Sequence, residues 1–195
     1  VTNGLSDLGI SSIASDGSTL VMGYGNGNLD IIEENLITNI PWIQKAEIAG
    51  DKTINSVYFD GNLIYVACNL GLVVIDNAKK EVKDTYYPYE NPVIYDVTIY
   101  QDTIFCGTPQ GIYQAYKDTP FLNSNANWNQ KTNLPASIVN DTIMEIETFG
   151  DKLVFSWNDS SFGNDSLYYF DGGTLINHPN NPMIVADLHA DENEL

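Results

Sequence analysis

An internal repeat constrains the fold of this chain more than any other feature of its sequence. Copies of one pattern of apolar residues begin at Ile10, Ile54, Ile94 and Ile143, so the repeat is 40 to 49 residues long. Further residues recur within the copies, namely Ile13, Val57, Val97 and Ile146, and then Gly27, Gly71 and Gly111. A fifth copy begins at Ile184 and includes Leu188, Asp191 and Leu195. A unit of this length cannot bury both of its faces alone, so successive copies are expected to stack on one another.

The second copy contains four short extended segments, Ile54–Phe59, Leu63–Cys68, Leu72–Asp76 and Val82–Tyr87. The first alternates apolar and polar residues, and the second is rich in β-branched and aromatic residues. Turn signals separate them, first Asp60-Gly61-Asn62 and then Asn69-Leu70-Gly71. Short strands spaced about ten residues apart predict an antiparallel sheet, and no helical period persists in this copy.

The repeat therefore predicts an all-β chain built from β-propeller blades, each a four-stranded antiparallel meander. A β-sandwich is the competing all-β fold, but it does not require repetition in register at this period. We expect one partial propeller domain over residues 1–195, with repeats near 10–40, 54–88, 94–118 and 143–178 and an incomplete repeat from 184. We expect a fragment of a larger propeller, which stays open or self-associates through its incomplete blade edges. The repeated glycines predict tight turns with positive φ or a close backbone approach.

Composition limits the classes of partner. The chain has 26 acidic and 8 basic residues, every basic residue is a lysine, and the formal net charge is −18. Nucleic acid is excluded as a partner because phosphate binding needs a positive field, and anionic membrane surfaces are disfavoured. No stretch approaches the roughly 18 apolar residues of a membrane span. The two cysteines, Cys68 and Cys106, fit no metal or redox spacing, and we favour buried free thiols over a disulfide.

The first repeat resembles the propeller motif of two-component regulators. The matching residues are Gly4-Leu5-Ser6-Asp7, Ile10-Ser-Ser-Ile13, Asp16-Gly17, Leu20-Val-Met-Gly23 and Gly27. The Trp-Ile-Gly-Thr that is usual in that motif is replaced by Leu20-Val-Met-Gly23 and by Ile64-Tyr-Val-Ala67. This departure favours a different propeller family over the sensor kinases.

Residues 1–115 are more similar to the N-terminal propeller of the PorZ family. The runs that carry this resemblance are Gly25–Asp30, Lys52–Val57 and Val82–Tyr86. The family comprises cell-surface or periplasmic proteins of Bacteroidetes that are linked to the type IX secretion system. The resemblance implies a periplasmic or cell-surface location. Since Val1–Leu5 is neither a signal peptide nor a usual chain start, we expect a longer precursor whose signal peptide lies outside this sequence.

Catalysis finds little support in the sequence. The two histidines, His178 and His189, have no nucleophile elbow and no partner at metal-ligand spacing. The arginine cluster of propeller glycosidases is absent because the chain has no arginine. We therefore predict no enzymatic activity and no cofactor, and carboxylates brought together from distant blades are the remaining enzymatic alternative.

The most unusual segment is an insertion in the fourth repeat, Trp157–Ser166. Its candidate ligand-binding residues are Trp157, Asn158, Asp159, Asn164 and Asp165, together with Trp128 from the Asn-rich connection Asp118–Pro135. Carboxylate and amide oxygens are the ligands that calcium prefers, and an aromatic ring beside amides could stack on a sugar. These residue types are also typical of solvated loops, and we favour a solvated hairpin over both kinds of site.

Two functions from different classes follow from the resemblance. The first is a non-enzymatic extracytoplasmic scaffold from a larger PorZ-like protein that presents its loops to a protein or surface-glycan partner. The alternative is the periplasmic ligand-sensing propeller of a hybrid two-component sensor that responds to carbohydrate. The remainder of the gene discriminates between them. A membrane span and kinase indicate the sensor, whereas a C-terminal secretion or anchoring domain indicates the scaffold.

Overall fold

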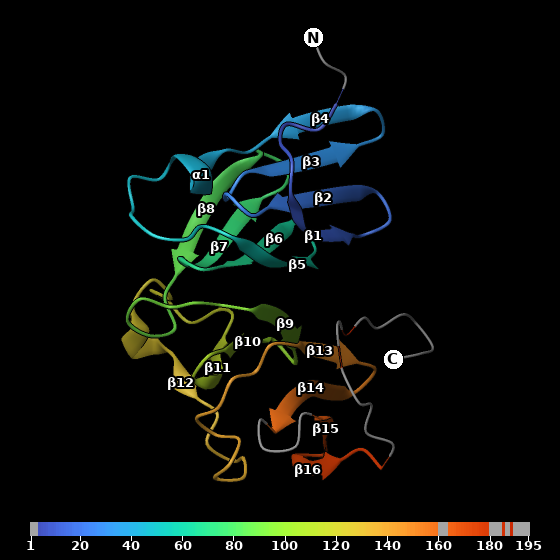
Figure 1. Cartoon of the computed structure of the whole chain (residues 1–195), viewed down its shortest axis with the longest axis vertical. Helices are drawn as coiled ribbons and strands as arrows, with labels where there is room; N and C mark the ends of the chain where they lie inside the picture. Colours follow the sequence, from blue (N-terminus) through green and yellow to red (C-terminus); the bar gives the residue numbers. More distant parts are fainter. Residues whose placement is uncertain (1–3, 160–163, 180–184, 186–187, 189–195) are drawn as a thin grey trace. The chain divides into compact units, whose positions relative to one another are not determined.

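The computed structural model describes residues 4–159, 164–179, 185 and 188. It is nearly all β, with four four-stranded antiparallel sheets in which each strand pairs with the next one along the chain (Figure 1). Propeller blades have this meander topology. The predicted all-β fold class is therefore confirmed.

The strands of the first two sheets are β1 (Ile10–Ser15), β2 (Thr19–Tyr24), β3 (Leu29–Glu33), β4 (Leu36–Asn39), β5 (Ile54–Asp60), β6 (Leu63–Cys68), β7 (Gly71–Asp76) and β8 (Glu81–Tyr86). The strands of the other two are β9 (Asp96–Tyr100), β10 (Thr103–Thr108), β11 (Gly111–Tyr116), β12 (Asn129–Gln130), β13 (Ile146–Phe149), β14 (Lys152–Asp159), β15 (Asn164–Asp171) and β16 (Thr174–Asn177). Two short helical turns occur in connections, α1 (Trp42–Lys45) and the 3₁₀ turn η1 (Asn125–Asn127).

The third sheet differs from the expected range 94–118. Its fourth strand is β12, only two residues long, and it follows an excursion of the chain that contains η1. The strand consists of the polar residues Asn129 and Gln130, so the sequence shows no apolar pattern that would indicate it. The predicted fifth repeat lies largely outside the described residues, which include only Val185 and Leu188 of it.

The chain divides into two compact units. The first comprises Val1–Ile94 and Leu122–Asn125, and the second comprises Tyr95–Phe121 and Ala126–Leu195. The core of the first unit lies between its two sheets and is formed mainly by Val21, Leu29, Ile31, Ile40, Ile43, Ile54, Val57, Ile64, Val66, Cys68, Val73 and Ile75. The core of the second unit includes Phe105, Ile112, Ile138, Ile143, Ile146, Leu153, Phe155, Trp157 and Phe170. In each unit the repeated apolar residues of one sheet thus pack against the next sheet.

A bulge in the first strand of a blade links it to the repeat that follows. The pairing of β1 with β2 shifts between Ile10 and Ser12, and the Ser11 hydroxyl donates a hydrogen bond of 2.6 Å to the carbonyl oxygen of Ile54. The pairing of β5 with β6 shifts at the equivalent place, and the Asn55 amide donates to the carbonyl oxygen of Ile94 at 2.7 Å. The extra residue of each bulge points its polar side chain at the next copy, so the bulge is part of the repeat's packing.

The repeated turn glycines adopt the predicted backbone conformation. Gly27, Gly71 and Gly111 have φ values of +83°, +129° and +100°. Residues that carry a Cβ atom rarely adopt a positive φ, whereas glycine does so readily. The prediction of a turn that requires glycine is confirmed at all three positions.

A buried carboxylate ties the N-terminal segment to the first sheet. Asp30 is fully buried and accepts hydrogen bonds from the Ser6 backbone N–H at 2.7 Å, the Tyr24 hydroxyl at 2.8 Å and the Asn39 amide at 3.0 Å. Burial alone would raise the pKa of Asp30, but these donors together outweigh it and lower the pKa. The three donors thus stabilise a charge that would otherwise be costly inside the fold.

Both cysteines are buried free thiols, as predicted. Burial raises the pKa of Cys68 to about 11 and raises that of Cys106 further. Because the thiolate is the reactive form, neither thiol is activated for nucleophilic or redox chemistry.

Candidate functional site

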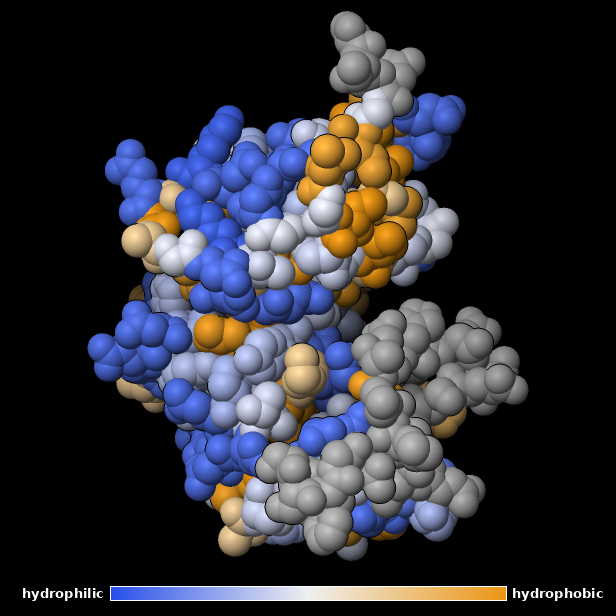
Figure 2. All heavy atoms as spheres, viewed as in Figure 1, coloured by the Kyte–Doolittle hydropathy of each residue, from blue (hydrophilic) through white to orange (hydrophobic). Residues whose placement is uncertain are grey.

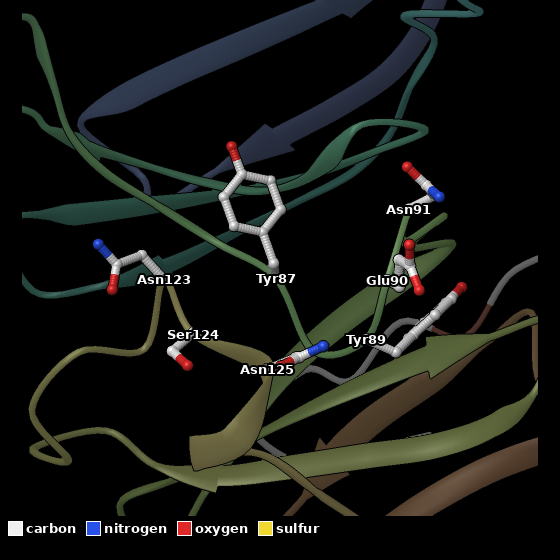
Figure 3. Close-up of a pocket in the computed structure, with 7 residues that line it drawn as sticks. All are labelled: Tyr87, Tyr89, Glu90, Asn91, Asn123, Ser124 and Asn125. Carbon is white, nitrogen blue, oxygen red and sulfur yellow. The ribbon is translucent and has the colours of Figure 1, made fainter.

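The first unit contains a polar pocket of about 400 Å³ (Figure 3). Two chain segments line it, one that follows β8 and one that leads into η1. The lining side chains are Tyr87, Tyr89, Glu90, Asn91, Asn123, Ser124 and Asn125. We refer to it below as the tyrosine–asparagine pocket.

Hydrogen bonds hold both walls of this pocket in place. The Tyr87 backbone N–H donates to the carbonyl oxygen of Leu122 at 3.4 Å, which joins the two segments. The Tyr89 hydroxyl donates to the carbonyl oxygen of Val93 at 2.9 Å and accepts a hydrogen bond from the Val93 N–H at 3.0 Å. Its ring is therefore fixed against its own loop. A site whose walls are held in advance loses less conformational entropy when a ligand binds.

The chemistry of the tyrosine–asparagine pocket suits a polyhydroxylated ligand. Tyrosine rings offer apolar faces, while asparagine side chains offer both donors and acceptors. Glu90 and Asn91 are exposed, and Glu90 adds an acceptor that favours neutral or cationic ligands over anionic ones. Nothing in the sequence indicated that Tyr87 and Tyr89 meet the Asn-rich connection Asp118–Pro135.

The hairpin of β14 and β15 contains the insertion singled out from the sequence. Trp157 is 9% exposed, its indole N–H donates to the Asp141 carboxylate at 3.1 Å, and its ring packs edge-on against Tyr168. Trp128, in the connection before β12, is 6% exposed. Both indoles are thus engaged in packing, and neither offers an open face on which a sugar could stack.

The polar residues of the hairpin pair with one another across its two strands. Asn158 lies opposite Asp165, and its amide donates to the Asp165 carboxylate at 2.5 Å. Asp165 is 7% exposed and also accepts a hydrogen bond from the Val185 backbone N–H. Asp159 and Asn164 form the next backbone pair. Within residues 4–159, 164–179, 185 and 188, no three His, Cys, Asp or Glu side chains are grouped to hold a metal ion.

A family of known proteins matches most of this chain. The family described as "TSS9, PorZ, N-terminal beta-propeller domain" matches residues 1–129. The chain belongs to the PorZ N-terminal β-propeller family. The resemblance seen in its first two repeats is thereby confirmed.

A solved PorZ structure agrees with this assignment, and two further solved structures share the fold. PorZ, named as an essential bacterial surface component of the type IX secretion system of Porphyromonas gingivalis, matches with a TM-score of 0.73 and 27% identity over 90% of this chain and 23% of that chain. The extracellular domain of the putative hybrid two-component system BT3049 of B. thetaiotaomicron matches with a TM-score of 0.61 and 15% identity over 92% of this chain and 26% of that chain. The WD40 β-propeller domain of Doa1 matches with a TM-score of 0.63 and 12% identity over 95% of this chain and 58% of that chain. No curated protein matches.

The chain spans about a quarter of the length of the PorZ and BT3049 structures that it resembles. In the part of this PorZ-family propeller that the structure describes, no helix has the length and apolar character needed to cross a membrane. His178 lies just after β16, where its ring packs edge-on against Tyr169 and its backbone N–H donates to the Leu167 carbonyl. It thus has a packing role at a strand end.

An apolar surface on the first blade of this PorZ-family propeller also escaped sequence reasoning. Ile10 and Ile13 are 43% and 59% exposed, whereas their repeat equivalents Ile54 and Val57 are 0% and 9% exposed. Leu8, on the segment before β1, is 89% exposed. Apolar residues gather on this part of the first unit, near the N-terminus (Figure 2). We call Leu8, Ile10 and Ile13 the β1 face.

Proposed function

We propose that this propeller domain is a non-enzymatic, extracytoplasmic interaction module of a type IX secretion-associated protein, and that its loops bind a surface glycan or a protein. Membership of the PorZ family supports the link to secretion. The observation that carries the binding role is the tyrosine–asparagine pocket, because its polar lining matches a sugar better than it matches an apolar ligand.

The proposed ligand of this pocket is a neutral glycan. Tyr87 lies on a wall of the pocket and supplies a ring for the apolar face of a sugar, while Asn123 and Asn125 supply amides for its hydroxyl groups. Glu90 is the charged side chain that lines this pocket, and its carboxylate opposes an anionic glycan there.

The proposed protein partner contacts the β1 face. Contiguous apolar residues on the surface of a soluble protein are typical of interaction sites. Another blade, from a second copy or from a partner, would bury Ile10 and Ile13 as their equivalents Ile54 and Val57 are buried. Self-association through this face is part of the proposal.

The hairpin of β14 and β15 remains a second proposed contact. Asn158 is exposed at its polar end, beside Asp165. Trp128, Trp157, Asp159 and Asn164 complete the set of residues proposed from the sequence. Because the two indoles are buried, any ligand here would be recognised by the amide and carboxylate groups.

A glycan array probed with the purified protein tests the proposed function. We expect binding to neutral surface polysaccharides, with loss of that binding in Tyr87→Ala and in Asn125→Ala. Tyr116→Ala is the control, since Tyr116 is an exposed tyrosine at the end of β11, outside the pocket. The assignment of this pocket is contradicted if the wild-type protein binds no glycan on the array, or if both Tyr87→Ala and Asn125→Ala still bind.

A carbohydrate-sensing propeller is the second candidate function. The similarity to the extracellular domain of the putative hybrid two-component system BT3049 favours it. The full-length gene decides between the two, because a membrane span followed by a kinase supports the sensor. A secretion or anchoring domain at the C-terminal end supports the scaffold.

A further inference from the structure

A second hollow, of about 290 Å³, lies in the second unit beside Lys131. Gln101 contributes from the turn between β9 and β10, and Thr103 from the start of β10. Asn133 contributes from the chain that follows β12, and Leu153 from β14. The hollow therefore combines amide and hydroxyl groups with apolar side chains around one ammonium group. Its lining is distinct from that of the tyrosine–asparagine pocket.

Two aromatic rings hold the ammonium group of Lys131. Its Nζ lies 4.2 Å from the centre of the Phe170 ring and 5.6 Å from the centre of the Phe105 ring. Both phenylalanines are at least 94% buried, being 5% and 6% exposed. Burial lowers the pKa of Lys131. The rings attract the cation through their quadrupoles, but they supply no hydrogen-bond acceptor for its N–H donors.

In the described part of the chain, Lys131 forms no ion pair. Four other lysines do, with Nζ to carboxylate distances of 3.3 Å for Lys79, 2.5 Å for Lys80, 3.0 Å for Lys117 and 2.9 Å for Lys152. Three carboxylates neighbour the hollow in the sequence. Asp102 and Asp151 are the partners of Lys117 and Lys152, and the charge of Asp171 acts on Lys152. A half-buried lysine that faces a hollow without a carboxylate is unusual in a chain with 26 acidic residues.

We propose that this hollow binds the carboxylate of a small ligand whose body is about the size of one sugar or amino-acid residue. Lys131 supplies the positive charge and charge-assisted hydrogen bonds to the carboxylate. The amides of Asn133 and Gln101 can bond to polar groups on the body of the ligand, while Leu153 and Phe105 contact its apolar part. The two pockets then select opposite chemistry, since Glu90 disfavours an anion in the tyrosine–asparagine pocket.

Lysine-selective NMR of the whole chain tests this proposal. The chain has eight lysines and no arginine, and the ring currents of Phe105 and Phe170 should shift the Lys131 side-chain signals away from those of the other lysines. The titrants are D-glucuronate and N-acetylphenylalanine, each compared with a neutral counterpart, D-glucose and N-acetylphenylalaninamide. We expect at least one of the carboxylates to move the Lys131 signals in a saturable way, and which of the two does so identifies the source of the carboxylate.

Two variants separate binding from folding. Lys131→Met retains an apolar stem over the two rings and removes the charge, so we expect a folded protein whose affinity for the carboxylate falls about tenfold or more. Lys79→Met, at an exposed lysine of the first unit, is the matched control and should leave the affinity unchanged. If Lys131→Met does not fold, Asn133→Ala replaces it.

The proposal is overturned if the Lys131 signals shift equally with a carboxylate and with its neutral counterpart, or if they show no saturable shift. It is also overturned if the folded Lys131→Met protein binds the carboxylate as tightly as the wild type. Loss of the tyrosine–asparagine pocket in Tyr87→Ala should leave this carboxylate site intact. Failure of one site is therefore distinguishable from failure of the other.

Discussion

Replacing Gly23 with alanine should expose how closely the first two blades are packed. Gly23 lies in β2, against the first strand of the second blade. A Cβ atom at this position would lie 2.4 Å from Cγ2 and 2.9 Å from Cβ of Ile54. Carbon atoms in contact are normally about 3.5–4.0 Å apart, so the new methyl group would overlap Ile54 by more than an ångström.

The size of the effect follows from the surroundings of Ile54. Its side chain is fully buried in the core of the first unit, and β-branched side chains have little freedom to rotate. Overpacking of this kind costs about 1–3 kcal/mol. Replacing glycine by alanine also restricts the unfolded chain, which offsets about 0.4–1 kcal/mol of that cost. We therefore expect Gly23→Ala to lower the free energy of unfolding by about 1–2 kcal/mol.

Urea unfolding followed by far-UV circular dichroism measures this change, with hydrogen exchange of peptides covering β5 to assign it to the first unit. With a slope of about 2 kcal/mol per molar urea, the midpoint should fall by about 0.5–1 M. Gly25→Ala is the matched control. Its φ is negative and its nearest contact would be the Gly9 oxygen at 3.9 Å, so its midpoint should stay equal or rise slightly.

A double-mutant cycle tests the assigned cause. Ile54→Ala removes Cγ2, the atom of closest approach, and keeps Cβ at 2.9 Å. Most of the overlap is thereby relieved, so Gly23→Ala should cost about 1 kcal/mol less in that background. If Gly23→Ala is as stable as Gly25→Ala, or costs the same with and without Ile54, the packing argument is wrong.

Three further predictions concern single groups. Asp30→Asn should destabilise the fold by about 1–3 kcal/mol at neutral pH, because the Tyr24 hydroxyl and the Ser6 N–H lose an acceptor. The pKa of Asp30 is lowered in the fold, so its stabilisation is present above the unfolded pKa of about 3.9 and is lost as the pH falls through the folded value. The difference in urea midpoint between the wild-type protein and Asp30→Asn should therefore become smaller in that acidic range. Lys52→Met should cost about 1–2 kcal/mol, since the Lys52 ammonium group bonds to two carbonyl oxygens at α1, at 2.6 and 2.8 Å, and an unchanged melting temperature would refute this. The two buried thiols should resist a disulfide reagent at pH 8 until urea unfolds the chain, and rapid labelling of the native protein would contradict their burial.

The fold was accessible from the sequence because it depends on features that recur. Ile54, Val57 and Gly71 have counterparts in the neighbouring repeats, so each strand and turn was indicated more than once. Local rules were sufficient for these elements, since alternation and turn residues act over a few positions. The outer strand β12 was missed because it is two residues long and follows a loop of more than ten residues.

The tyrosine–asparagine pocket could not be derived in the same way. Its two walls are more than thirty residues apart, and they meet through one backbone hydrogen bond from Tyr87 to Leu122. A backbone bond leaves no trace in the identity of the side chains. The same limitation applies to Trp157, which lies in a segment that the sequence predicts to be a solvated hairpin. Its indole is instead held by Asp141 and Tyr168.

Comparison of equivalent positions in the repeats indicates what kind of surface can cover the β1 face. The surface that covers Ile54 is the strand β2, where Gly23 leaves room for it, and in the second unit Gly107 lies at the matching position, where a Cβ would come within 2.8 Å of the Ile143 carbonyl oxygen. Ala67 and Ser156 occupy this position in the second and fourth repeats, so a small residue recurs there in all four copies. Ile10 has the same residue type as Ile54 and Ile143 but remains exposed. A partner that covers the β1 face in the manner of a blade must therefore offer a strand with a small residue opposite Ile10, and a bulky side chain there would hold the two surfaces apart.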